Sequence, residues 1–145
     1  KAHKDKLPKI ANLFNRDGGP EPPVGISVPQ AMYDDFVKIS EPIQKIRPDY
    51  PFEVKVREPR KRPTRMGGTD ASVFAIEGVP TLGFTTEDFK GYDFDYGEIW
   101  HTERDLYTKN IPEYQEHTAT VTAIIALGVA NLDKQLSREG LYTEE

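Results

Sequence analysis

Residues 110–136 read NIPEYQEHTATVTAIIALGVANLDKQL, and this stretch decides how the rest of the chain is arranged. Positions 114, 118, 121, 125, 128, 132 and 136 recur at intervals of three or four, the spacing of one face of an α-helix. Asn110 and Glu113 stand three residues apart in the pattern of a capping box, which predicts where the helix begins. The stripe predicts one long helix over residues 111–138 packed across a sheet. Gly128 within it predicts a point of close approach.

The preceding residues predict that sheet and a second helix. Residues 52–57 alternate apolar with charged side chains, as expected of a strand near a sheet edge. Met32, Phe36, Ile39 and Ile43 follow helical spacing, in a helix that Pro42 is expected to bend or end. Further strands are expected over residues 10–15, 24–28 and 79–84, and a short helix over residues 69–76, with Thr69 as its N-cap. We therefore predict an α/β fold, a short mixed sheet flanked by helices.

The composition limits what the protein can be. At 145 residues, 37% hydrophobic and 30% charged, the chain fits one folded domain, residues 1–145. A net charge of −5 argues against nucleic acid as a partner, and no apolar run approaches the roughly 20 residues of a membrane span. Because the chain has no cysteine, any metal must be held by carboxylates and imidazoles.

Two residues are candidate metal ligands. His101 lies in a long irregular segment, residues 87–105, that is rich in acidic and aromatic side chains. Such segments in compact domains are usually functional, whereas His3 and His117 are expected to be structural. Asp17 follows the first expected strand and precedes two glycines, at a place where open α/β sheets bind ligands. The same residues also suit an ordinary glycine turn that Asp17 caps.

Three short motifs follow one another along the chain. They are Asn-Arg-Asp-Gly-Gly at residues 15–19, Gly-Gly-Thr-Asp-Ala at 67–71 and Trp-His-Thr-Glu-Arg-Asp at 100–105. In this order and spacing they resemble the C-terminal half of the M28 family of zinc peptidases, which are co-catalytic aminopeptidases and glutamate carboxypeptidases. The resemblance spans essentially the whole chain and implies a partial zinc-peptidase (phosphorylase/hydrolase-like) fold.

The resemblance implies a centre with two zinc ions. Asp17 matches an aspartate ligand in an Asn-x-Asp-Gly motif. His101 matches the last histidine ligand, at the head of a His-Thr-x-x-Asp motif that ends at Asp105. The two ligands would bind different ions of the pair. Thr69 and Asp70 match a segment that lines the substrate site.

Two positions depart from the family pattern. Ala71 stands where many members have a histidine, so this position cannot donate a hydrogen bond or bind metal. Trp100 stands where peptidases often have a tyrosine whose hydroxyl steadies the oxyanion. A tryptophan at this place resembles the glutaminyl cyclases, relatives that bind one zinc ion and form pyroglutamate.

The family's His-x-Asp segment and its paired glutamates, one of them the general base, have no match in the chain. A hydrolytic zinc ion needs about three protein ligands and a water. We therefore expect the C-terminal portion of a zinc exopeptidase catalytic domain, with no catalytic residue of its own. We expect it to be inactive alone and to bind zinc weakly.

The partner of this portion would be the N-terminal half of the domain, and its substrate a peptide. The resemblance implies a secreted or periplasmic location. Two alternatives stay open: a non-catalytic interaction module that forms a homodimer through exposed apolar surface, and a glutaminyl cyclase-like acyltransferase.

Overall fold

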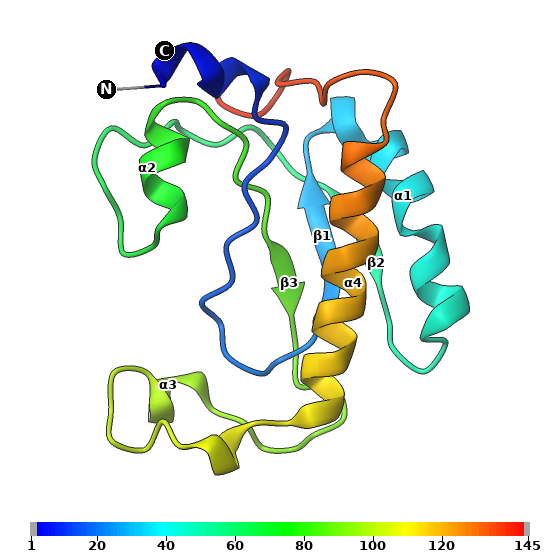
Figure 1. Cartoon of the computed structure of the whole chain (residues 1–145), viewed down its shortest axis with the longest axis vertical. Coiled ribbons are helices and arrows are strands. Elements are labelled where there is room, and N and C mark those ends of the chain that lie inside the picture. Colours follow the sequence, from blue (N-terminus) through cyan, green and yellow to red (C-terminus); the bar gives the residue numbers. More distant parts are fainter. Residues whose placement is uncertain (1–2, 144–145) are drawn as a thin grey trace.

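A three-stranded mixed sheet lies at the centre of the computed structural model, which describes residues 3–143 (Figure 1). Its strands are β1 (Pro23–Val28), β2 (Glu53–Val56) and β3 (Phe84–Thr86), in the order β2-β1-β3. β1 pairs in parallel with β2, with Ile26 opposite Val54, and antiparallel with β3, with Ile26 opposite Phe84. The predicted α/β class and the edge position of β2 are confirmed.

Helix α1 (Tyr33–Ile46) follows a 3-10 turn, η2 (Gln30–Met32), and packs against β2. Met32, Phe36, Ile39 and Ile43 are all buried, so the predicted stripe is confirmed. The helix does not end at Pro42, which was one of the two effects expected of this proline, because α1 continues for another turn past it. Pro42 itself is exposed, while Ile39 and Ile43 on either side are held in the core.

Helix α4 (Pro112–Ala130) packs against both α1 and β1 (Figure 1). The contact with α1 is tight: a Cβ on Gly128 would lie 2.4 Å from Cγ2 of Ile39. The predicted close approach is therefore confirmed, with α1 as the neighbour. The helix is shorter than predicted. It ends where Asn131 caps it, its side-chain amide donating to the Leu127 carbonyl at 2.9 Å.

The chain beyond α4 still contributes to the core. Leu136 and Leu141 are 4% and 1% exposed, although both lie in an irregular segment that turns back over the core. Position 136 of the apolar stripe is therefore buried, but by the fold of this segment and not by the helix. None of the helices within residues 3–143 is long and apolar enough to cross a membrane.

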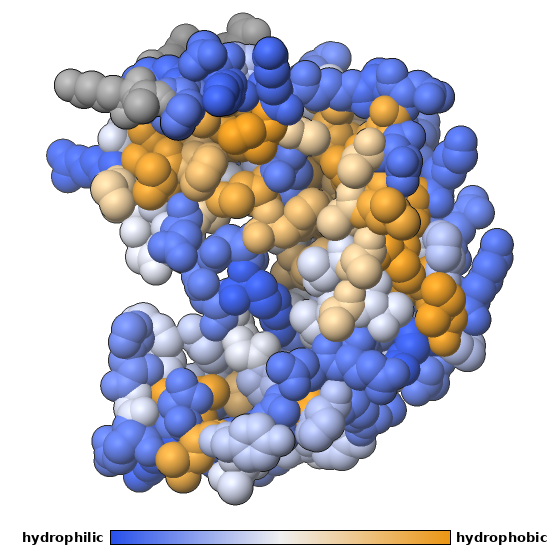
Figure 2. All heavy atoms as spheres, viewed as in Figure 1, coloured by the Kyte–Doolittle hydropathy of each residue, from blue (hydrophilic) through white to orange (hydrophobic). Residues whose placement is uncertain are grey.

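The smaller elements lie away from α1. Helix α2 (Ala71–Ile76) and helix α3 (Tyr96–Ile99) stand at opposite ends of the molecule, on the side of the sheet remote from α1 (Figure 1). The 3-10 helices η1 (Lys4–Lys9) and η3 (Tyr107–Lys109) complete the described elements. The hollow between the α2 and α3 ends of the molecule is visible in the space-filling view (Figure 2).

Candidate functional site

An open cleft of about 1110 Å³ brings the predicted site residues together. Its walls come from residues 16–20, from 68–70, from the α3–η3 region and from α4. All six residues selected from the sequence line it: Asp17, Thr69, Asp70, Trp100, His101 and Asp105. The structure thus gathers three motifs that are far apart in sequence at one surface.

The segment before Asp17 is extended but is not the predicted strand. Its main contact is a side chain: Asn12 donates to the Leu82 carbonyl at 3.2 Å and accepts from the Leu82 amide at 2.8 Å. One backbone bond, from Leu13 N to the Pro80 carbonyl at 2.9 Å, adds to it. The expected strand over 79–84 is also wrong for most of its length, because β3 begins only at Phe84. The two segments are joined chiefly by the Asn12 side chain, which replaces regular backbone pairing.

Asp17 sits in a turn that its neighbours close. The Asn15 amide donates to Oδ2 of Asp17 at 2.9 Å, and the Arg16 guanidinium donates to the carbonyls of Gly19, at 2.7 Å, and Glu21. Burial lowers the pKa of Arg16, and the charge of Glu21 opposes this shift. Asp17 itself is exposed toward the cleft, so its second carboxylate oxygen is free to accept a ligand.

Gly19 connects this turn to the loop that carries His101. Its φ of +66° is a left-handed conformation, and a Cβ there would lie 3.0 Å from Phe94 and 3.2 Å from Tyr96. Any larger residue would thus strain the backbone and push against both rings. The close packing of these aromatic rings on Gly19 ties the Asp17 turn to the start of α3.

His101 lies just after α3. Asp95 caps this short helix by accepting from Gly97 N at 2.8 Å, and the buried Ile99 anchors its end. His101 has a φ of +57°, and its ring meets that of Trp100 edge to face at 4.8 Å. Among the described residues no carboxylate is hydrogen-bonded to the His101 ring, so none of them orients the imidazole.

Thr69 and Asp70 form the opposite wall of the cleft. Thr69 was predicted to cap the helix that follows, but Asp70 occupies the N-cap position, and neither makes a capping side-chain bond. The turn is closed by the backbone instead, since Ser72 N donates to the Thr69 carbonyl at 3.1 Å. Both side chains are exposed and thus available to a ligand in the cleft.

The described residues bring together too few ligands for a complete metal site. Across residues 3–143 no three histidine, aspartate or glutamate side chains come together in a group that would hold a metal ion. Asp17 and His101 line the same cleft, but a zinc site takes about three protein ligands. The described residues thus do not by themselves fit a complete zinc centre.

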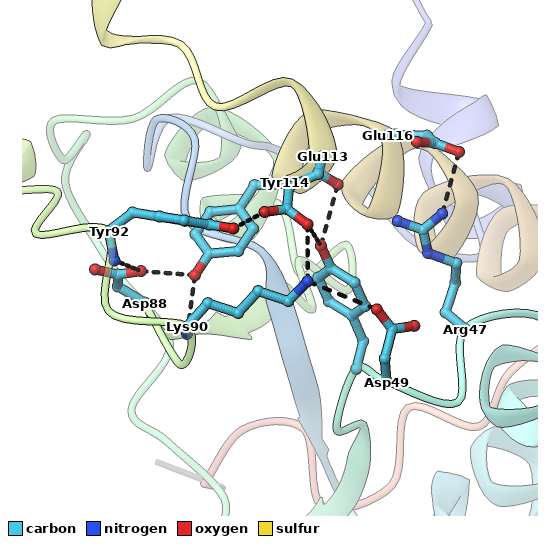
Figure 3. Close-up of polar contacts among 9 residues, drawn as sticks. Arg47, Asp49, Asp88, Lys90, Tyr92, Glu113, Tyr114 and Glu116 are labelled. Atoms are coloured by element: carbon cyan, nitrogen blue, oxygen red, sulfur yellow. Dashed lines mark hydrogen bonds and ion pairs between the residues drawn. The ribbon is translucent and has the colours of Figure 1, made fainter.

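A cluster of charged and tyrosine side chains fixes the loop before α3 to the start of α4 (Figure 3). This cluster, here called the loop clasp, consists of Tyr50, Asp88, Lys90, Tyr92, Glu113 and Tyr114. Lys90 Nζ lies 2.7 Å from Glu113 Oε2 and 4.6 Å from the centre of the Tyr50 ring. Tyr92 also donates to Glu113, whose pKa is lowered to about 2 by its bonds from Lys90 and Tyr92. The bond to Glu113 raises the pKa of Lys90.

A second part of the loop clasp is less exposed. The Tyr114 hydroxyl donates to Asp88 at 2.6 Å and accepts from Lys90 N at 3.0 Å. Burial, and then the bond to Asp88, raise the pKa of the Tyr114 hydroxyl, and the same bond lowers the pKa of Asp88. Asp88 further accepts from the backbone amides of Tyr92 and Phe94. The clasp therefore holds the loop whose aromatic rings pack on Gly19 beside Asp17.

The loop clasp was not predicted from the sequence. Glu113 was predicted to close a capping box with Asn110, but the N-cap position is Ile111 and no side chain caps the helix. Glu113 faces the tertiary partners Lys90 and Tyr92, which no local pattern indicates. Leu106 and Tyr107, exposed apolar residues on the cleft wall, were also missed. The only indication in the sequence was that these two apolar residues stand within a polar stretch.

His117 behaves as the structural histidine that the sequence suggested. It is fully buried, its Nε2 lies 3.0 Å from the Pro23 carbonyl, and its ring stacks on Tyr50 at 4.0 Å. Burial lowers its pKa, which favours the neutral imidazole. It is not among the residues that line the cleft, although Thr118 beside it is.

Comparisons of the chain with protein-family models, curated proteins and solved structures found no match. The M28 resemblance therefore stays a prediction from the sequence motifs.

Proposed function

We propose that the chain is the C-terminal part of the catalytic domain of an M28-like zinc exopeptidase, and that the cleft is its share of the peptide-binding site. The observation that carries the proposal is the convergence of Asp17, Thr69, Asp70, Trp100, His101 and Asp105 on one cleft. These residues were selected from motif order alone, and they come from three separate segments. Their convergence is what one shared binding site requires, and this supports the proposal.

In this proposal Asp17 and His101 each supply one ligand to a different zinc ion. The zinc ions would supply an activated water and polarise the peptide carbonyl. The remaining ligands and the general base come from a partner segment, because the described residues hold no complete site. The residues of this chain position the ligands: the Asn15 bond orients Asp17, and His101 follows α3 on another wall of the same cleft.

A cobalt(II) titration tests the assignment, because cobalt takes the same imidazole and carboxylate ligands as zinc and quenches a nearby indole. Trp100 is the only tryptophan, and its ring lies 4.8 Å from that of His101. We expect weak, saturable quenching that a chelator reverses. His101→Ala should abolish most of it, while His3→Ala, an exposed histidine outside the cleft, should leave it unchanged.

Calorimetry with zinc measures binding at Asp17 independently of the Trp100 emission. Weak zinc binding that falls in Asp17→Asn but not in Asp133→Asn is expected. Two tight zinc sites in the chain alone would contradict the proposal, because the chain would then need no partner segment. Quenching by cobalt that is equal in the wild type and in His101→Ala would contradict it as well.

A further inference from the structure

The wall of the cleft formed by residues 100–107 exposes large apolar side chains to solvent. Trp100 is 59% exposed, Leu106 57% and Tyr107 91%, and all three line the cleft. Trp100 is backed by Tyr96, whose ring stacks on it at 6.5 Å and 30°. Apolar side chains that share one concave wall mark a binding surface more often than a chance exposure does.

The charges on the cleft are unbalanced in favour of acids. Asp17, Asp70 and Asp105 line it, and each is exposed. The two cations of the lining are already engaged by the protein. Lys109 Nζ pairs with Glu98 at 3.2 Å, and Arg16 donates to backbone carbonyls of its own turn.

Arg16 is a poor anchor for an incoming anion for a second reason. Its Nε is buried away from solvent and makes no hydrogen bond within the described residues, so a ligand in the cleft has no access to that side of the guanidinium. A ligand therefore meets exposed carboxylates and exposed aromatic faces. Both attract cations, the carboxylates by charge and the rings through their quadrupoles.

We propose that the cleft binds a cationic amine that carries an aromatic or large apolar side chain, that is, the free amino end of a peptide with such a first residue. This inference rests on the proposed function and deepens it: it selects the aminopeptidase type over the carboxypeptidase type. A carboxypeptidase needs a free cation to hold the terminal carboxylate of its substrate, and the described cleft residues place both of their cations on protein acceptors.

Emission of Trp100 tests this directly, because no other tryptophan contributes. The probes are phenylalanine amide, a cation with a ring, N-acetylphenylalanine, an anion with the same ring, and alanine amide, a cation without one. A chelator is present throughout, so that metal plays no part. We expect saturable binding of phenylalanine amide, and binding of the other two probes that is about tenfold weaker, as expected when several screened charge contacts or the ring contact are lost.

Matched variants identify the residues responsible. Leu106→Ala and Asp105→Asn remove cleft groups, whereas Leu127→Ala and Asp133→Asn make the same changes at exposed positions outside the cleft. We expect each cleft variant to weaken binding of phenylalanine amide about threefold, and each control to leave it unchanged. Circular dichroism of all four variants shows whether the fold is kept.

Three results would overturn the inference: no saturable response to phenylalanine amide, tighter binding of N-acetylphenylalanine, or equal effects of cleft variants and controls. The outcome is separable from that of the proposed function. Binding of the amine without any metal binding would contradict only the metallopeptidase proposal. Metal binding with preference for the anionic probe would contradict only this inference and would favour the carboxypeptidase type.

Discussion

Replacing Gly128 by alanine tests the packing of α4 on α1, on which the whole arrangement depends. Two effects oppose each other in this variant. Alanine in place of glycine inside a helix stabilises by about 1 kcal/mol. Against this, the new Cβ would lie 2.4 Å, 2.9 Å and 3.1 Å from three atoms of Ile39.

The steric effect should win. Ile39 is buried and β-branched, and a β-branched side chain in a helix has essentially one χ1 rotamer, so it cannot turn away. The two helices must separate instead, and overpacking of this kind costs about 1–3 kcal/mol. With three contacts below the usual limit we take the upper part of that range. Gly128→Ala should then destabilise the protein by about 1–2 kcal/mol in net terms.

Urea unfolding followed by circular dichroism measures the effect. Ala123→Gly, an exposed position in the same helix, gives the propensity term and should cost about 1 kcal/mol. Ile39→Ala removes two of the three close atoms, so in that background Gly128→Ala should be neutral or stabilising. A stabilising Gly128→Ala in the wild type, or the same effect in both backgrounds, would refute the close-approach argument.

Three further changes test the site and its supports. Glu113→Gln should remove a loss of stability that the wild type shows as the pH falls from about 4.5 to about 2, because the folded pKa of Glu113 lies below its unfolded value. Urea unfolding midpoints measured at several pH values test this, and the same pH dependence in variant and wild type would contradict it. His117→Phe should remove a loss of stability that begins as the pH falls below 6.5, because burial lowers the pKa of His117 and protonation then favours unfolding. A urea unfolding midpoint of the variant that still falls with pH in that range would count against this. Asn12→Ala should lower the free energy of unfolding by about 1–3 kcal/mol, since it leaves the Leu82 backbone groups unpaired. A loss in the same urea assay no larger than that of an exposed surface substitution would show the pairing to be unimportant.

The features that the sequence predicted correctly are those set by periodicity and by short-range chemistry. The stripe from Met32 to Ile43 fixes one face of α1, and the alternation over residues 52–57 identifies an edge strand. Gly128 marks the helix contact because nothing larger fits there. The six site residues also meet at one cleft as their motifs suggested, although their chemical roles remain predictions.

The features that the sequence missed depend on partners distant in the chain. Glu113 has the local pattern of a capping residue, but ion pairing with Lys90 and hydrogen bonding to Tyr92 compete with that role and prevail. The segment over residues 10–15 has the apolar character of a strand, yet the Asn12 side chain takes the place of backbone pairing. Periodicity carries no information on either choice, because both are decided by tertiary contacts.

A map of where a metal ion binds in the folded protein tests the assignment of the cleft most directly. Line broadening of amide NMR signals by added cobalt(II) provides it, because signals close to the ion disappear first. Signals around Asp17 and around His101 should be lost early, while the signals of His117 and of the α1–α4 contact at Gly128 persist. Broadening that spares both the Asp17 and the His101 segments, or that centres on His3, would contradict the assignment of this cleft as a metal-binding site.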